Sequence, residues 1–405
     1  MSLADAEPLR VGVIGMGSAW LTFMPSLAQS PRVKIVAGAD PRPEARTKFA
    51  ANFGAEVFET ADELCASGGV EAVYVATPHR FHAQHVIAAA ANGKHAICDK
   101  PMALTLGECD AMIDATNRAG AQLVVGPSQG FSPPVLEIRK IICSGEFGRL
   151  GMINTWSYKD FIYRARSPED LDPALGGSSA LNQGPHQADV VRWIGGGLVR
   201  SVRSMVGTWD PTRPIDGAYT VFLEFEDGAA ATMAFSGYGR FDTDEFHDWV
   251  GEGGQQRRAG VYGNQRGQLA QMAPEAVAAA KATSIYGGGR ERPVALDGSG
   301  PPFHPHFGTT IVSCERADLC PSPTGVTIYD DDGRRELPVS VAPFAQAGVV
   351  DELYYAIRNG RSTTHDGRWG KATLEVCLAI LQSGREHREV VLHHQVPTPD
   401  SSRTT

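Results

Sequence analysis

The stretch Val73–Pro101 constrains the fold more than any other part of the sequence. Two short apolar runs, Val73–Ala76 and His95–Cys98, have the length and composition of buried parallel strands, and an X-Pro dipeptide closely follows each of them. Between them, His82–Ala91 carries apolar residues at helical spacing, and Asn92-Gly93 gives a helix stop. The pattern predicts a strand–helix–strand unit, and parallel sheets built from such units bind ligands at the carboxyl ends of their strands.

A glycine turn near the amino terminus predicts a dinucleotide site. A short apolar strand runs into Gly15-Met16-Gly17, a helix follows, and a second apolar run, Val33–Ala39, ends at Asp40. In such sites the first glycine permits the sharp turn, and the second lets the backbone approach a pyrophosphate at the helix N-terminus. In such sites an acidic residue at the position of Asp40 accepts hydrogen bonds from the adenosine ribose. The predicted cofactor contacts around this turn are Gly15, Gly17, Ser18, Asp40 and Arg42.

Two residues near the turn bear on how the cofactor is bound. The carboxylate of Asp40 would repel a 2′-phosphate, so we expect NAD in preference to NADP, which the nearby Arg42 and Arg46 do not exclude. Trp20 stands where the G-x-G-x-x-G pattern has its third glycine, a residue that allows close packing of helix and strand. We therefore expect the helix to tilt, or the indole to lie along the cofactor or the domain edge.

Two further groups of polar residues indicate a catalytic site. Asp99-Lys100-Pro101 follows a predicted strand, where the lysine is either a structural ion-pair partner or a group that meets the substrate. Asn182, His186 and Asp189 follow a glycine-rich loop, and Pro185 suits the first turn of a helix. Residues three or four apart are neighbours on a helix, so the histidine is expected to lie between an amide and a carboxylate. The alternative is an ordinary structural histidine.

Together these motifs resemble the Gfo/Idh/MocA family of nicotinamide-dependent oxidoreductases. The matching motifs are Gly15-Met16-Gly17, Asp40-Pro41, Thr77-Pro78-His79 with His82, Gly93-Lys94-His95, Asp99-Lys100-Pro101, Gly145-Glu146-Phe147-Gly148, and His186 with Asp189. The resemblance implies that the cofactor site also includes Thr77, Pro78, His79, His82, Asp99 and Lys100.

The same resemblance assigns catalytic roles. It implies that His186 is the general base for the hydroxyl proton, while Lys100 hydrogen-bonds the oxygen as a hydride passes from a carbinol carbon to nicotinamide. The aspartate of the family's D-x-x-x-H pattern is replaced by Asn182, which cannot take up a proton. Proton transfer would therefore rest on His186 and Lys100, with Asn182 beside them in the catalytic site.

The composition fits an enzyme that acts on small molecules in the cytoplasm. The chain has 405 residues, 42% of them hydrophobic, and a net charge of −9, which argues against nucleic acid or an anionic membrane as a partner. We see no apolar run long enough for a membrane span and no signal-peptide pattern. The seven cysteines are scattered, as is typical of reduced thiols, and no Cys/His cluster suggests a metal.

We expect an α/β protein with a Rossmann dinucleotide-binding domain over residues 1–130, an α+β domain over 131–396 and a disordered tail over 397–405. In the second domain, Tyr219–Phe225 and Ala229–Phe235 alternate in polarity around Asp227-Gly228, which predicts a hairpin within a largely antiparallel sheet. Further strands are predicted at Met152–Tyr158, Val199–Val206 and Glu336–Val341. Residues 251–302 are expected to be irregular with one helix, Pro274–Thr283. The resemblance implies helices on one sheet face and a homodimer or homotetramer built through the other.

The substrate is less constrained by the sequence. Residues 202–211, 235–238, 241–246 and 251–253 look like a branch of the family, the phthalate 4,5-cis-dihydrodiol dehydrogenases, which oxidise a cyclic diol to a ketone that tautomerises to a catechol. Two ring carboxylates would need cationic partners, for which Lys159, Arg164 and Arg166 are candidates, each equally readable as a solvated surface charge. The alternatives are a sugar or polyol dehydrogenase, a regulatory protein that holds the dinucleotide without turnover, and a hydrolase or lyase that uses transient oxidation.

Overall fold

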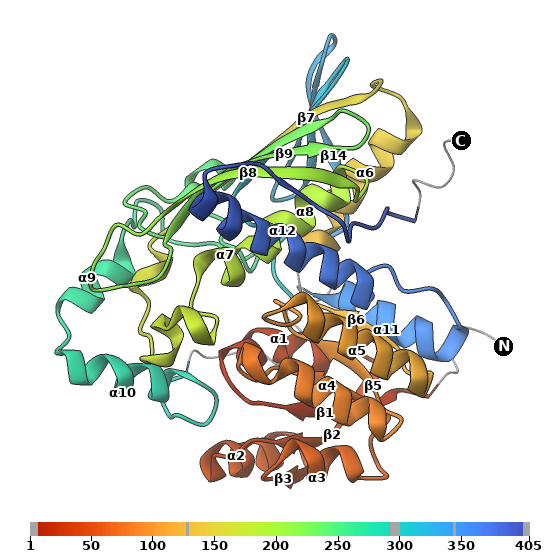
Figure 1. Ribbon diagram of the computed structural model, residues 1–405, viewed down its shortest axis with the longest axis vertical. Coiled ribbons are helices and arrows are strands. Elements are labelled where there is room, and N and C mark those ends of the chain that lie inside the picture. Colours follow the sequence, from red (N-terminus) through yellow and green to blue (C-terminus); the bar gives the residue numbers. More distant parts are fainter. Residues whose placement is uncertain (1–6, 127–128, 292–299, 343–345, 400–405) are drawn as a thin grey trace. The chain divides into compact units, whose positions relative to one another are not determined.

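The computed structural model describes residues 7–126, 129–291, 300–342 and 346–399, which divide into two compact units (Figure 1). Unit 1 contains the described residues 7–126, 278–291 and 346–371, and unit 2 contains 129–277, 300–342 and 372–399. The chain thus returns to unit 1 twice. The sequence predicts a single division near residue 130 instead, because nothing in a local pattern shows that a later segment packs back onto an earlier one.

Unit 1 is built on a parallel sheet of six strands in the order β3-β2-β1-β4-β5-β6. The strands are β1 (Leu9–Ile14), β2 (Val33–Ala39), β3 (Glu56–Phe58), β4 (Ala72–Val75), β5 (His95–Cys98) and β6 (Leu123–Val125). The helices of this unit are α1 (Ser18–Ala28), α2 (Pro43–Phe53), α3 (Ala61–Ala66), α4 (His82–Ala91), α5 (Leu106–Ala119) and α11 (Ala347–Asn359). Strands β1 and β4 are apolar and almost entirely buried, as a parallel sheet covered on both faces requires. The predicted Rossmann fold is confirmed.

Local signals account for the helix ends in unit 1. The side chains of Thr60 and Thr105 each accept a hydrogen bond from the backbone N–H of a glutamate three residues later. The carboxylate of that glutamate in turn accepts a hydrogen bond from the threonine N–H. Helix α4 has the predicted bounds, and Gly93 follows it with a positive φ of 68°. The stop read from Asn92-Gly93 is therefore confirmed.

Unit 2 is built on a sheet of nine strands in the order β14-β13-β12-β11-β7-β10-β9-β8-β15. The strands are β7 (Leu150–Tyr158), β8 (Val199–Gly207), β9 (Ala218–Phe225), β10 (Ala230–Ser236), β11 (Thr309–Cys314), β12 (Asp318–Pro321), β13 (Gly325–Asp330), β14 (Gly333–Pro338) and β15 (Val390–Val391). Strands β7 and β10 pair in parallel, and the other neighbouring strands pair antiparallel. The largely antiparallel sheet and the β9–β10 hairpin are confirmed.

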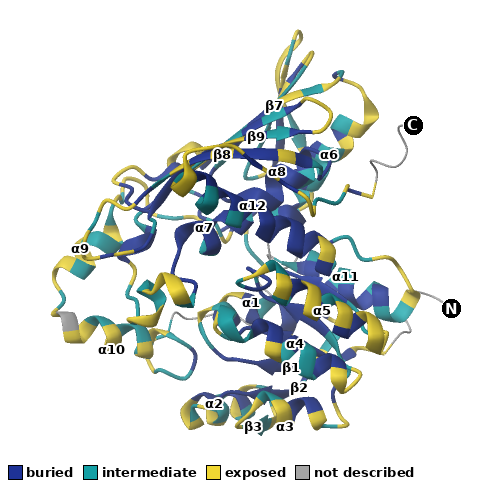
Figure 2. Cartoon of the chain, in the orientation of Figure 1, coloured by how far each residue is buried: buried dark blue, intermediate teal, exposed yellow. Residues whose placement is uncertain are grey.

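Helices cover one face of this sheet. They are α6 (Pro133–Ser144), α7 (Ser179–Asn182) and α8 (Gly184–Ile194), while α10 (Pro274–Ser284) and α12 (Gly367–Glu386) contain residues of both units. Helix α9 (Asn264–Ala270) instead contacts the 3-10 turn Phe161–Tyr163. Figure 1 shows α6, α8 and α12 along the same face, and Figure 2 shows α8 to be largely buried there. The opposite face exposes Met152, Trp156, Met205 and Phe222. Among the described residues, no helix combines the length and hydropathy needed to cross a bilayer.

Three expectations for unit 2 need correction. Strands β11–β13 were missing from the prediction; of these, β12 has only four residues and contains a proline. The strand expected at Glu336–Val341 is β14, which ends at Pro338. The described part of 251–302 contains α9 as well as α10. Helix α9 lacks a local cap, but the Asp160 carboxylate, far earlier in the chain, accepts hydrogen bonds from its first turn. Of the tail, residues 397–399 are ordered, with Thr398 buried and its N–H donated to Gly196, while 400–405 lie outside the described residues.

Candidate active site

The glycine turn between β1 and α1 leaves room for an anion. Gly15 has a φ of +90°, and a Cβ there would come within 2.9 Å of the carbonyl of Ala76. Gly17 is the N-cap of α1, and no heavy atom outside its own chain neighbours lies within 4 Å of the place where its Cβ would be. Gly15 is therefore needed by the fold, whereas Gly17 keeps a space free at a helix N-terminus, where a pyrophosphate fits. Ser18 follows as the first residue of α1 and is exposed.

Asp40 ties the end of β2 to this turn. Its buried carboxylate accepts a hydrogen bond from the N–H of Met16 at 2.8 Å and from the N–H of Arg42 at 3.0 Å. The guanidinium of Arg42 donates two more, from Nε at 2.9 Å and from Nη2 at 3.1 Å. Four hydrogen bonds use all the lone-pair sites of a carboxylate. A ribose hydroxyl would therefore have to replace part of the Arg42 contact.

Trp20 packs inside unit 1. The placement along the cofactor or the domain edge that we expected from the sequence is therefore wrong. The indole is fully buried, with its ring centroid 5.6 Å from that of Phe49, 5.8 Å from that of Phe53 and 6.2 Å from that of Tyr286. Arg42 also donates to the carbonyl of Tyr286 at 3.0 Å. Segment 278–291 thus packs on α1 and α2, and its tyrosine completes the aromatic cluster that accommodates the tryptophan.

His82 joins the loops that follow β4 and β5. Its Nε2 lies 2.8 Å from the carbonyl oxygen of Thr77, and its Nδ1 lies 2.9 Å from that of Pro101. The side chain is fully buried, and burial lowers the pKa of this imidazole. His82 therefore holds the Thr77-Pro78-His79 loop against the Asp99-Lys100-Pro101 loop, while the direct cofactor contact predicted for it stays a prediction.

The other predicted residues of unit 1 lie on these two loops. Asp99 is buried and accepts the N–H of Lys100 at 2.8 Å, and burial raises the pKa of its carboxyl although the Lys100 charge opposes this. The peptide between Lys100 and Pro101 is cis. His79 opens a 3-10 turn, with its ring centroid 5.6 Å from that of His82. Because β2, β1, β4 and β5 are neighbours, the sheet brings the predicted cofactor residues to one edge, at the carboxyl ends of its strands.

In unit 2, Asn182 and His186 do not share one unbroken helix. Asn182 ends α7, Gln183 breaks the helical pattern, and His186 lies in the first turn of α8, where its N–H donates to the carbonyl of Gln183 at 3.1 Å. The Asn182 amide donates to the carbonyl of Ser178 at 2.9 Å, which ties it to the loop before α7. The chain changes helix between the two residues, so the single helical turn expected for them is interrupted, while their neighbouring positions stay a prediction.

Asp216 anchors this region and was missed by the sequence reasoning. Its backbone carbonyl accepts the N–H of Ser179 at 3.1 Å, and its carboxylate accepts the N–H of Ala180 at 2.8 Å. Burial raises the pKa of Asp216 to about 6. The residue follows α7 by more than thirty positions in the sequence, so no local cap pattern could have identified it.

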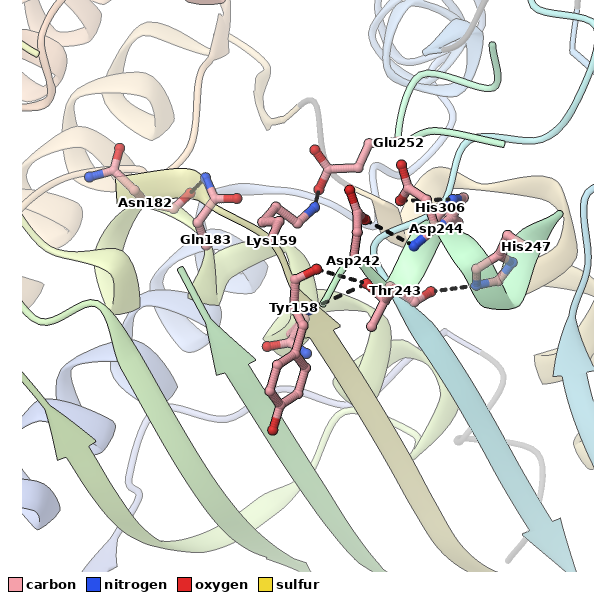
Figure 3. Close-up of polar contacts among 12 residues, drawn as sticks. Tyr158, Lys159, Asn182, Gln183, Asp242, Thr243, Asp244, His247, Glu252 and His306 are labelled. Atoms are coloured by element: carbon pink, nitrogen blue, oxygen red, sulfur yellow. Dashed lines mark hydrogen bonds and ion pairs between the residues drawn. The ribbon is translucent and has the colours of Figure 1, made fainter. Parts of the chain in front are cut away.

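Lys159 lies near His186 through a shared phenyl ring. The ring centroids of His186 and Phe307 are 4.9 Å apart, and the Lys159 ammonium is 4.9 Å from the same Phe307 centroid. The ammonium and the imidazole are therefore separated by no more than twice that distance. Lys159 is only 8% exposed and pairs with Glu252, toward which it points in Figure 3. It is thus a buried charge and not a solvated surface lysine.

Arg164 and Arg166 have different surroundings. Arg164 is exposed, with its guanidinium 5.0 Å from the Phe161 ring centroid. Burial raises the pKa of the Glu252 carboxyl, but the charges of Lys159 and Arg164 outweigh it and lower the pKa to about 2. Arg166 lies 4.3 Å from the same Phe161 centroid, and burial lowers its pKa to about 10. Lys159 therefore pairs with Glu252, whereas Arg164 and Arg166 both lie against the Phe161 ring.

Beside this group lies a second polar cluster. Arg257 pairs with Asp242 at 2.8 Å and with Asp244, and the rings of His247 and His306 stack with centroids 3.9 Å apart (Figure 3). Burial, and then the neighbouring His306, lower the pKa of His247 to about 3. In the described ranges, no three His, Cys, Asp or Glu side chains are grouped in a way that would hold a metal ion.

Known proteins match the chain over most of its length. The model of an oxidoreductase family with an NAD-binding Rossmann fold, Gfo/Idh/MocA, matches residues 9–127, and that of the Gfo/Idh/MocA C-terminal domain matches residues 135–265. The 1-carboxy-3-chloro-3,4-dihydroxycyclohexa-1,5-diene dehydrogenase of Comamonas testosteroni is 36% identical over 93% of this chain and 95% of its own. Levoglucosan dehydrogenase of Pseudarthrobacter phenanthrenivorans is 32% identical over 52% of this chain and 56% of its own.

A solved structure is similar over nearly the entire chain. A candidate dehydrogenase from Bordetella bronchiseptica RB50 has a TM-score of 0.89 and 40% sequence identity, covering 95% of this chain and 100% of that one.

Proposed function

Since this chain belongs to the Gfo/Idh/MocA family of NAD-binding oxidoreductases, we propose that it oxidises a ring alcohol of a cyclic diol that carries a carboxylate, with NAD as the hydride acceptor. The observation that carries this proposal is Lys159, a buried cation that shares the Phe307 ring with His186. A buried lysine next to a candidate base is suited to hold an anionic group of a substrate. The Comamonas relative is named for a cyclohexadiene with one carboxy group and hydroxyls on neighbouring ring carbons, which is this class of molecule.

The residues of the chain divide the work as follows. When bound, NAD would supply the acceptor for the hydride, and the hydride carries both electrons of the C–H bond away from the carbinol carbon. His186 takes up the hydroxyl proton, so that the C–O bond becomes a carbonyl. Lys100 donates a hydrogen bond to the oxygen on which negative charge develops. Asn182 holds the loop before α7 and, with it, the approach to His186. A cyclohexadiene ketone formed in this way tautomerises to a catechol, and aromatisation drives the reaction forward.

A sugar or polyol dehydrogenase is the second candidate. It is favoured by the Lys159–Glu252 pair, because a lysine whose charge is already compensated has less need of an anionic partner. The curated relatives also include levoglucosan dehydrogenase.

We also propose that the protein is a cytoplasmic homodimer or homotetramer that acts in the breakdown of aromatic compounds. The exposed apolar side chains on the uncovered sheet face of unit 2 support assembly through that face. None of the seven cysteines forms a disulfide, which suits a reducing compartment.

The reaction is tested by following NADH absorbance with a panel of substrates. Cyclic cis-dihydrodiols that carry ring carboxylates are expected to reduce NAD with a higher kcat/KM than inositol, glucose or levoglucosan. A preference for any of these neutral polyols would favour the second candidate, and no reduction of NAD by any member of the panel would contradict both.

A further inference from the structure

A lysine that is distant in the sequence lies beside the first turn of α1. The ammonium Nζ of Lys281 donates a hydrogen bond to the hydroxyl Oγ of Ser18 at 3.3 Å. Ser18 is the first residue of α1 and directly follows Gly17, where the missing Cβ leaves the space into which a pyrophosphate fits. Because a serine hydroxyl is only two bonds from its Cα, the ammonium lies close to the backbone N–H groups of this turn.

The family models do not account for this lysine. They match residues 9–127 and 135–265, and Lys281 lies outside both ranges. It nevertheless belongs to unit 1, as Ser18 does. The NAD-binding Rossmann fold thus supplies the glycine turn and the helix N-terminus, whereas the lysine is an addition from a later part of the chain.

Segment 278–291 is anchored on α2 by contacts that do not involve the lysine. The hydroxyl of the buried Tyr286 accepts a hydrogen bond from the side-chain amide of Asn52 at 2.9 Å. Gly287 has a φ of +80°, and a Cβ there would lie 2.8 Å from the Cα of Ala45, so the segment runs against the backbone of α2. The lysine is therefore held near α1 before any ligand binds, which lowers the entropy cost of using it.

The charge at the N-terminus of α1 is suited to an anion. The first turn of α1, which lies wholly within the described range 7–126, contains no acidic residue, and the N-terminus of a helix carries partial positive charge. Asp40, which accepts the N–H of Met16 in the same turn, is paired with Arg42. The Lys281 ammonium thus adds positive charge to an end that is already positive, which is unfavourable until an anion binds there. A pyrophosphate would accept hydrogen bonds from the helix N–H groups and the ammonium together.

We propose that Lys281 is a cofactor-binding residue, whose ammonium binds the pyrophosphate of NAD together with the backbone of the glycine turn. The lysine acts on cofactor affinity and takes no part in the hydride or proton transfer. The proposal goes beyond the proposed reaction and does not depend on its substrate, because NAD binding can be measured without one. The alternative is a structural role, since a cation in the last turn of α10 also stabilises that helix.

Calorimetric titration of Lys281→Met with NAD, ADP and adenosine, all without substrate, tests the proposal. NAD and ADP both carry linked phosphates and should each bind about tenfold more weakly than to the wild type, because hydrogen bonds to charged groups are strong. Adenosine has no phosphate, so its affinity should change by less than about twofold. Equal losses for all three ligands, or unchanged affinities for NAD and ADP, would overturn the proposal.

A comparison with NADP shows which phosphate the lysine meets. NADP differs from NAD by a phosphate on the adenosine ribose, at the far side of the pyrophosphate from the nicotinamide. Lys281→Met should weaken the binding of both cofactors by the same factor, so that the ratio of their affinities stays that of the wild type. A loss confined to NADP would mean that the lysine binds the ribose phosphate, and this would contradict the assignment to the pyrophosphate.

Three controls separate this role from a general charge effect and from a structural one. Arg290→Gln removes a positive charge from an exposed position of the same segment and should leave NAD affinity as in the wild type, so a loss equal to that of Lys281→Met would refute the proposal. Lys281→Arg keeps the charge and should keep most of the affinity. In urea, NAD-free Lys281→Met should be about as stable as the wild type, since the cation is favourable at the end of α10 and unfavourable at the start of α1. A destabilised variant with unchanged NAD affinity would show the lysine to be structural.

Discussion

The two glycines of the turn after β1 are expected to respond very differently to alanine, because one is required by the fold and the other by a ligand. Gly15→Ala must adopt a φ of +90° and place a methyl group within 2.9 Å of the Ala76 backbone. Left-handed strain costs about 1–2 kcal/mol and overpacking a further 1–3 kcal/mol or so, so we expect a loss of about 2–5 kcal/mol in the free energy of unfolding.

Gly17→Ala should be nearly neutral for the unliganded protein. The residue has a φ of −85°, which alanine adopts freely, and its Cβ would meet no heavy atom within 4 Å outside the chain neighbours. The weaker N-cap of alanine costs a few tenths of a kcal/mol or more, and the reduced freedom of the unfolded chain returns about 0.4–1 kcal/mol. The added methyl group would however enter the space into which a pyrophosphate fits. We therefore expect NAD affinity to fall by about tenfold or more, equivalent to at least about 1.4 kcal/mol of binding free energy.

Urea unfolding followed by circular dichroism measures the first quantity, on protein freed of NAD because bound cofactor raises apparent stability. Calorimetric titration with NAD measures the second. If Gly17→Ala is destabilised as much as Gly15→Ala, the space beside Gly17 is not free in solution. If it binds NAD as the wild type does, the pyrophosphate is not bound at this helix N-terminus.

Five further changes test the remaining assignments. Lys100→Ala and His186→Ala should each lower turnover by about a hundredfold or more while NAD affinity stays nearly unchanged, and turnover that survives both changes would place the chemistry elsewhere. Asp40→Ala should narrow the ratio of NAD to NADP affinity measured by calorimetry, and equal affinities already in the wild type would remove the role given to its charge. The pKa of Asp216 is raised to about 6 in the folded protein from 3.8, so the protonated carboxyl stabilises the fold at low pH. This contribution, of roughly 3 kcal/mol, is lost as the pH rises through 6. In Asp216→Asn the unfolding free energy should therefore no longer fall between pH 4 and 7, and a pH dependence like that of the wild type would contradict the role given to burial. Asn182→Asp loses the amide donor to the Ser178 carbonyl and should lower stability in urea by about 1–3 kcal/mol, whereas an equally stable variant would mean that this contact is not formed.

Much of unit 1 could be predicted because its signals are local. The apolar runs that became β4 and β5, the helix between them and the turn at Gly15 each depend on residues adjacent in the sequence. The parallel sheet then places the ends of neighbouring strands together without further information. What the sequence could not show is the return of segment 278–291, whose Tyr286 completes the packing of Trp20. A tryptophan in a glycine position indicates that the packing of helix on strand must differ from the usual one. The aromatic partner that completes this packing, however, lies more than 250 residues later in the sequence.

The same limit applies to helix α9 and to the α7–α8 pair. Residues of α9 have no cap of their own, and their first-turn N–H groups are satisfied by Asp160 from a distant loop. Spacing alone suggested that Asn182 and His186 occupy one helix, because a four-residue interval is compatible with an unbroken turn. The Gln183 N–H still donates to the carbonyl of Ser179 as in an α-helix, and the Asp216 contacts hold only the first residues of α7, so no pattern in the adjacent sequence marks the break.

The substrate-binding charges show why residue types alone leave a function open. Lys159 was identified from the sequence as a cation that might equally be solvated, and both meanings were consistent with its neighbours in the chain. Its contact with Phe307 and its pairing with Glu252, 93 residues later, remove the solvated alternative. The pairing also compensates the charge that suggested a carboxylate ligand, so a count of basic residues in one segment does not give the number of cations available to a substrate.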